Sequence, residues 1–91
     1  MSNYLITPRG EIQEAAPKRG AAFTVTELQD MVGGYIEVMD VNGGVVVYDS
    51  DGAQKEKLYN EKATKLILDS NQEWDGFVAG NAVFCHKIVV D

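Results

Sequence analysis

Few side chains in this sequence have the types and the spacing that catalysis requires. The chain has one histidine, His86, and one cysteine, Cys85, and the two are adjacent. On a β-strand adjacent side chains point to opposite faces, so this pair cannot act as a nucleophile and its base. His86 is expected to share a face with Phe84 and Ile88, which favours a partly buried structural histidine. We assign no catalytic residue and predict that the protein is not an enzyme.

The acidic residues offer a second route to chemistry, through a bound cation. Asp49 and Asp51 lie in a predicted turn, where a hard cation could bind their carboxylates together with backbone oxygens. A helix–loop–helix calcium site, however, needs several more ligands and a bidentate glutamate at the end of its loop. A turn built on hydrogen bonds from the backbone is the better interpretation. We predict no metal site, and the absence of Walker, GxGxxG and GxSxG motifs predicts no cofactor.

Binding has more candidates than catalysis. The tyrosines and the single tryptophan can form an aromatic surface of the kind enriched in interfaces, and they can equally fill a small core. Asn60 precedes a predicted helix whose N-terminus favours anions, although Glu61 already lies at the positive end of the helix dipole. The candidate binding residues are Tyr35, Glu37, Tyr48, Tyr59, Asn60 and Trp74.

Composition excludes several classes of partner. Fourteen acidic residues outnumber eight basic ones, and no run of lysine and arginine forms the patch that binds a phosphate backbone, so we predict no nucleic-acid partner. No segment approaches the roughly 20 apolar residues of a membrane span, so we predict no membrane partner. A single cysteine and an N-terminus without the features of a signal peptide predict a cytoplasmic protein.

The elements that position these residues begin with a predicted hairpin and a helix. Residues 4–7 and 11–14 are strand-prone, and the Pro-Arg-Gly sequence between them predicts a turn. Thr24 and Glu27 have the spacing of a capping box, which predicts the start of a helix with one apolar face. Gly33 supplies the left-handed residue that ends it.

The second half of the chain predicts a central hairpin, a second helix and a last strand. Residues 35–41 and 45–48 form two strands joined by an Asn-Gly-Gly turn, and 54–58 can form a further short strand. Asn60 is a good cap for a helix with a narrow apolar stripe. Residues 77–90 are β-rich, and a Gly-Asn pair can bend or bulge this last strand near its start.

This order predicts one small α+β domain over residues 1–91. The elements follow the order β-β-α-β-β-(β)-α-β, and we expect two helices packed on one face of a mostly antiparallel sheet. The other face would then meet water or a partner. Because several strands carry apolar residues on both sides, we expect that face to be buried, and one solution is a homodimer.

Several segments, taken in order, resemble a family of domains of unknown function common in bacteriophages, plasmids and bacterial genomes. The resemblance covers about residues 5–90 and is carried by the sequences GGYIE at 33–37, YDSDG at 48–52, NEKAT at 60–64 and GNAV at 80–83. Two positions depart from the family pattern: Asp49 stands in place of an asparagine, and Ser50 in place of an acid. The resemblance implies a small accessory protein, often carried by a mobile element, and it implies no activity.

Two functions remain open at this point. The first is a non-catalytic accessory protein, related to mobile elements such as phages, that binds a still unknown protein partner through a sheet face or edge. The second is a protein that binds or sequesters a small, nucleotide-type ligand, for which the tyrosines and the amides near Asn60 would supply the site.

Overall fold

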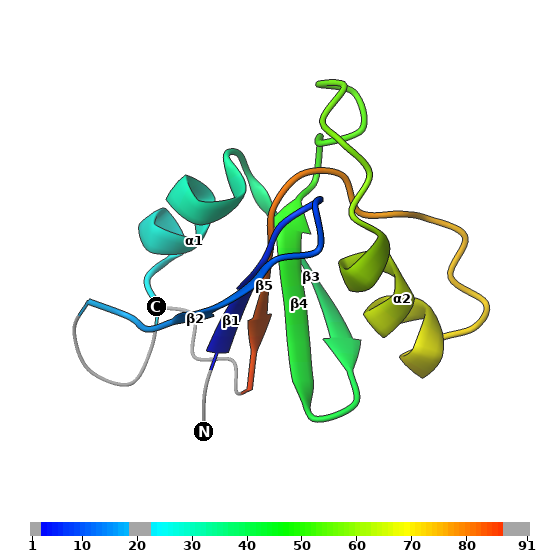
Figure 1. The fold of residues 1–91 in the computed structure, drawn as a ribbon, viewed down its shortest axis with the longest axis horizontal. Helices are drawn as coiled ribbons and strands as arrows, with labels where there is room; N and C mark the ends of the chain where they lie inside the picture. Colours follow the sequence, from blue (N-terminus) through cyan, green and yellow to red (C-terminus); the bar gives the residue numbers. More distant parts are fainter. Residues whose placement is uncertain (1–2, 19–22, 87–91) are drawn as a thin grey trace.

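The computed structural model describes residues 3–18 and 23–86, and in these it contains an antiparallel sheet and two helices (Figure 1). The sheet has five strands in the order β2-β1-β5-β4-β3. The α+β class, the antiparallel sheet and the order of the elements are as predicted. The elements are β1 (Asn3–Ile6), β2 (Ile12–Ala15), α1 (Val25–Val32), β3 (Ile36–Val41), β4 (Gly44–Asp49), α2 (Glu61–Ser70) and β5 (Ala82–Cys85).

Both helices begin at the residues that the sequence predicts. At the start of α1 the Glu27 N–H donates to Thr24 Oγ1 at 3.1 Å, and the Thr24 N–H donates to Glu27 Oε1 at 2.9 Å, which completes the capping box. α1 ends at Gly33, whose φ of 82° lies in the left-handed region. At the start of α2 the Ala63 N–H donates to Asn60 Oδ1.

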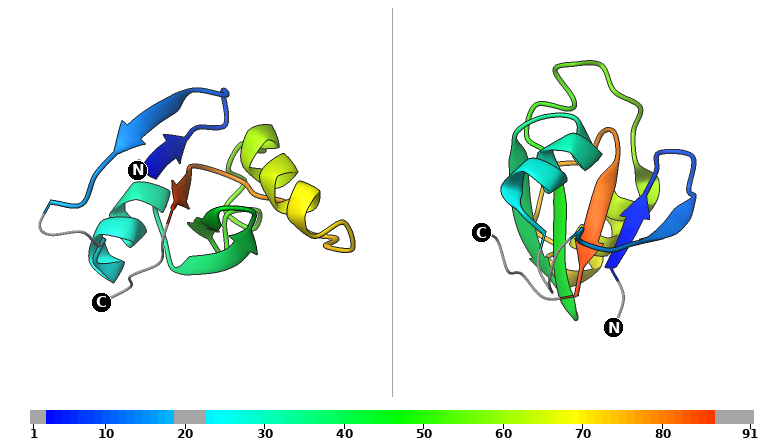
Figure 2. Two further views of the ribbon diagram at one scale, coloured as in Figure 1. Left: turned by 90° about the horizontal axis from the view of Figure 1, so that it is seen from below. Right: turned by 90° about the vertical axis from the view of Figure 1, so that its left-hand side faces the viewer.

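The two helices lie on opposite faces of the sheet, so the prediction that both pack on one face is wrong. Val47 of β4 packs with Leu28 of α1, whereas the next residue toward the N-terminus, Val46, packs with Ile67 of α2. The left view of Figure 2 shows the sheet running between the helices. The physical reason is the apolar run in β4, which presents buried side chains to both faces and is shielded from water only when each face meets a helix.

Two segments differ from the predicted strands. Residues 54–56 lie in turns and residues 57–58 have no regular secondary structure, so no strand forms there; the nearby pairing in the part of the chain that the structure describes is an isolated antiparallel bridge between Tyr59 and Ala79. The predicted strand over 77–90 begins only at Ala82, because Gly80 adopts a φ of 88° and turns the chain first. The part of that prediction over residues 87–90, which includes the face shared by His86 and Ile88, lies outside the described residues.

Candidate interaction surface

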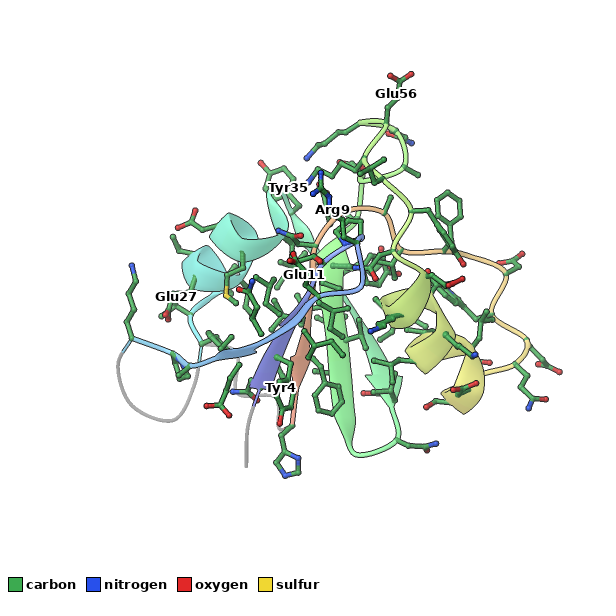
Figure 3. The ribbon with its side chains drawn as sticks, viewed as in Figure 1. Tyr4, Arg9, Glu11, Glu27, Tyr35 and Glu56 are labelled. Atoms are coloured by element: carbon green, nitrogen blue, oxygen red, sulfur yellow. The ribbon has the colours of Figure 1, made fainter. Side chains whose placement is uncertain are left out.

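The six candidate binding residues do not form one surface. Tyr35, Glu37 and Tyr59 are exposed, Tyr48 and Asn60 are buried, and Trp74 is half-buried. The two most exposed rings are those of Tyr35, with 74% of its surface exposed, and Tyr59, with 52%. Figure 3 shows Tyr35 at the same end of the molecule as Glu56, in the loop that precedes α2. The set therefore divides into core residues and surface residues.

Asn60 is a structural residue of the core. Its Nδ2 donates to the carbonyl oxygens of Ile6 and Gly80, each at 2.9 Å, and its Oδ1 accepts from the Ala63 N–H at 3.1 Å. The residue is fully buried. The side chain is thus occupied within the chain, joining the start of α2 to β1 and to the segment that enters β5. This geometry gives Asn60 no polar atom to offer a ligand.

The aromatic residues make two separate ring contacts. Tyr48 and Trp74 meet edge to face, with centroids 6.5 Å apart, in the core beneath α2. Burial, and then the charge of Glu37, raises the pKa of the Tyr48 hydroxyl. Tyr59 and Phe77 meet at 6.0 Å, and each of these rings is about half exposed. Of these two ring pairs, the Tyr59–Phe77 pair is therefore the one that offers an aromatic surface to a partner.

An ion cluster around the buried Asp49 carboxylate is the polar feature that the sequence analysis missed. Asp49 Oδ2 lies 2.6 Å from Lys57 Nζ and 3.0 Å from Lys55 Nζ, and the Asp49 side chain is fully buried. The Asp51 N–H also donates to Asp49 Oδ1, at 2.9 Å. Burial acts to raise the pKa of Asp49, but the hydrogen bonds from Lys57, the Asp51 backbone and Lys55 outweigh it and lower this pKa to about 2.

The same two lysines also bind the end of α1. Lys57 Nζ donates to the carbonyl oxygen of Val32 at 2.8 Å, and both Lys57 Nζ and Lys55 Nζ lie 3.3 Å from that of Gly33. Cations at this position satisfy carbonyls that a helix leaves unbonded and oppose the negative end of its dipole. The two lysines follow the aspartate along the chain, but nothing in their local spacing shows that α1 lies beside them.

Gly34 lets the chain pass close to this cluster. A Cβ atom at Gly34 would lie 2.5 Å from Lys55 Nζ and 2.6 Å from Asp49 Oδ1. A neighbouring open depression of about 500 Å³ is bordered by Tyr35, Lys55 and Asp51, among others. Because Lys55 already pairs with Asp49, the depression offers no unpaired lysine to an anion. The glycine pair of the GGYIE segment therefore serves the ion cluster and the end of the helix.

The second exposed feature is the outer edge of β3. Tyr35 accepts a hydrogen bond from the Ser50 N–H at 2.9 Å, and from there every second residue of β3 bonds to β4. The intervening residues Ile36, Val38 and Asp40 turn their backbone N–H and C=O groups away from β4. In residues 3–18 and 23–86, none of the backbone hydrogen bonds of turns, loops and helix caps involves the N–H or C=O groups of these three residues.

The Cys85 thiol is enclosed by the core beneath α1. It is 4% exposed, and burial raises its pKa to about 11. The backbone N–H of the adjacent His86 donates to Asn3 Oδ1 at 2.9 Å. A thiol held in its neutral form by burial is a weak nucleophile.

No group of three or more histidine, cysteine, aspartate or glutamate side chains in residues 3–18 and 23–86 is arranged to hold a metal ion. Neither of the two helices found there has the length and the apolar composition needed to cross a membrane.

These features define a small α+β domain with a five-stranded antiparallel sheet between two helices, an open edge at β3 and, at one end, an ion cluster around a buried aspartate. The model of a family described as a domain of unknown function, DUF3846, matches residues 1–89, so the chain belongs to that family. No curated protein matches the chain. No solved structure matches it either.

Proposed function

We propose that this chain is a non-catalytic, cytoplasmic accessory protein, of the kind carried by phages and other mobile elements, that binds a protein partner through the edge of its sheet. The association with mobile elements is supported by the sequence resemblance alone. The acidic composition supports a protein partner in preference to a nucleic acid. The buried, neutral thiol of Cys85 supports a non-catalytic role.

The observation that carries this proposal is the open β3 edge. Each face of the sheet packs against a helix, so a sheet face is no longer the natural contact surface. A homodimer is not part of the proposal. The sequence predicts one only where an apolar face of the sheet is left uncovered, and here a helix packs on each face. An open edge strand instead presents unpaired backbone groups that an extended segment of another protein can bond.

The alternative of a nucleotide-type ligand has less support in this geometry. The residues expected to build that site are separated, since Asn60 is occupied within the core and Tyr48 packs against Trp74. The open depression beside Tyr35 has a shape that encloses little of a ligand, whereas small-molecule sites bury most of their ligand.

Selection from a library of displayed random peptides tests the proposed function. The immobilised chain should enrich a limited set of peptides, and hydrogen exchange should place a synthetic copy of an enriched peptide on one surface of the chain. Nucleotides should be tested separately, by measuring the rise in the melting temperature of the chain that a bound ligand causes. Failure to enrich any peptide, together with stabilisation by a nucleotide, would reject the partner-binding proposal in favour of the ligand binder.

A further inference from the structure

We infer that the edge of β3 accepts an extended segment of another protein with the pattern basic–apolar–apolar–basic, which adds a sixth strand to the sheet. This inference rests on the proposed function and names the partner's chemistry. The occupant is a strand that carries lysine or arginine three residues apart, with two apolar residues between them. The support from the structure has three parts: the backbone groups of β3, the side chains of β3, and the charges that a second copy of the chain would bring.

The backbone of β3 supplies the first part. Ile36, Val38 and Asp40 direct their N–H and C=O groups to the open side, over a strand six residues long. An added strand can therefore form an antiparallel ladder along its whole length. In Figure 1, β3 is the last strand of the sheet on the side away from β1 and β2. β2, at the other end of the sheet, has only four residues.

The side chains of β3 set the chemistry of the added strand. Glu37 and Asp40 are exposed, whereas Val38 and Met39 are half-buried against the two cores. Residues directly opposite each other on neighbouring strands share a face and lie close together, and opposite charges there are stabilising. Lysine or arginine opposite Glu37 and Asp40, with apolar residues opposite Val38 and Met39, therefore complements the edge.

Charge argues against a second copy of this chain as the occupant. In an antiparallel pairing of two β3 strands, the residues that face the open side must lie opposite each other, so a pairing centred on Val38 places Glu37 opposite Met39 and Asp40 opposite Ile36, and neither carboxylate meets a cation. The registers that do bring carboxylates together place Glu37 opposite Glu37 or Asp40 opposite Asp40, and like charges directly opposite each other destabilise a strand pair. Charged residues on an edge strand are also a common means of preventing self-association. The chain as a whole carries a net charge of −6, which adds to the repulsion between copies.

The test uses fluorescence anisotropy with a labelled Thr-Lys-Val-Ile-Lys-Thr peptide. It is compared with a peptide in which both lysines are glutamate and with one methylated on the isoleucine amide, which would lie opposite Val38. The lysine peptide should bind at least about tenfold more tightly than either. Methylation removes a backbone donor and leaves the charges unchanged, so equal binding of the methylated peptide would overturn the strand-addition geometry.

A charge exchange on the protein gives the matched test. The double variant Glu37→Lys/Asp40→Lys should lose at least about tenfold in affinity for the lysine peptide and gain a preference for the glutamate peptide. The control variant Glu73→Lys/Asp75→Lys makes the same change in net charge at two exposed residues outside the sheet and should bind like the parent. If both double variants weaken binding equally, the attraction is a general effect of net charge and the inference is wrong.

The location of the peptide separates this inference from the proposed function. Hydrogen exchange should show protection at the amides of Ile36, Val38 and Asp40 when the lysine peptide binds. If the library selects peptides of another pattern, or if protection falls at the exposed Tyr59–Phe77 pair, the chain remains a partner-binding protein but the β3 inference fails. Dimerisation of the free chain through β3 would also overturn it.

Discussion

Among single residues, Asp49 has the environment that most clearly depends on its charge. Its carboxylate is fully buried, and it binds two lysines and a backbone amide. Lys55 and Lys57 also bind the end of α1, so the carboxylate fixes the cations that join this helix to the loop before α2. Removing one partner from a buried ion pair costs more than the pair contributes, because the remaining charge is left without compensation.

We expect Asp49→Asn to lower the free energy of unfolding by about 2–3 kcal/mol, since the amide can still accept from the Asp51 N–H but cannot neutralise the lysines. Urea denaturation followed by circular dichroism measures this. Asp51→Asn is the matched control, because its side chain is exposed and only its backbone joins the cluster. Similar small effects in both variants would show that the Asp49 charge is unimportant for stability.

The lowered pKa of Asp49 gives a second expectation for the same residue. Its pKa is about 2 in the folded protein against an ordinary value of 3.8, so its contribution to stability is present above pH 4 and is lost as the pH falls toward 2. The difference in unfolding free energy between the protein and Asp49→Asn should therefore shrink by roughly 2 kcal/mol between pH 5 and pH 2. A difference that stays constant with pH would contradict the assignment.

Among the elements, α2 is attached to the sheet through its first residues. Thr64 Oγ1 accepts from the Val78 N–H at 2.9 Å, and Asn60 bonds the carbonyl oxygens of Ile6 and Gly80. The same asparagine caps the helix. One turn of α2 therefore sets the position of β1 and of the segment that leads into β5.

Asn60→Ala should lower the free energy of unfolding by about 3 kcal/mol, because it removes the buried hydrogen bonds to the carbonyl oxygens of Ile6 and Gly80 and to the Ala63 N–H. Thermal and urea denaturation provide the measurement. Asn71→Ala, at the exposed opposite end of α2, replaces the same residue type and should change stability by less than about 0.5 kcal/mol. If the two variants lose equal stability, the buried hydrogen bonds of the Asn60 side chain contribute little to the stability of the fold.

At the scale of the whole molecule, the sheet separates two small cores, and each is closed by one helix. Cys85 lies in the core beneath α1, and its neighbour in sequence, Phe84, packs against the core beneath α2. Because both cores share β4 and β5, opening either of them exposes the side chains of the same strands. We therefore expect the molecule to unfold as a single cooperative unit.

The reactivity of the Cys85 thiol tests this expectation. Its raised pKa of about 11, against an ordinary value of 9.0, and its burial should make alkylation at pH 8 at least about 100-fold slower in the folded protein than in urea. The labelling rate should rise with denaturant in parallel with global unfolding. Rapid labelling of the folded protein would show that the core beneath α1 opens on its own.

Features with a local physical cause could be predicted from the sequence. The capping box of α1, its glycine stop and the Asn60 cap depend on residues only a few positions apart, so their spacing identifies them. The alternation and the apolar run in residues 35–48 likewise predict the central hairpin. The binding role assigned to Tyr35, Glu37 and Tyr59 remains a prediction, with all three on the surface.

Only the tertiary structure decided which groups meet across long stretches of chain. The apolar residues of β4 show that both faces are buried, but the positions of α1 and α2 depend on the packing of the whole sheet. Asn60 meets Ile6 across 54 positions, and Lys57 meets Val32 across 25. The sequence by itself determined the elements and their ends, because local hydrogen bonds and periodicity set them. The arrangement of helices, the ion cluster and the open edge followed from long-range packing, which no local pattern encodes.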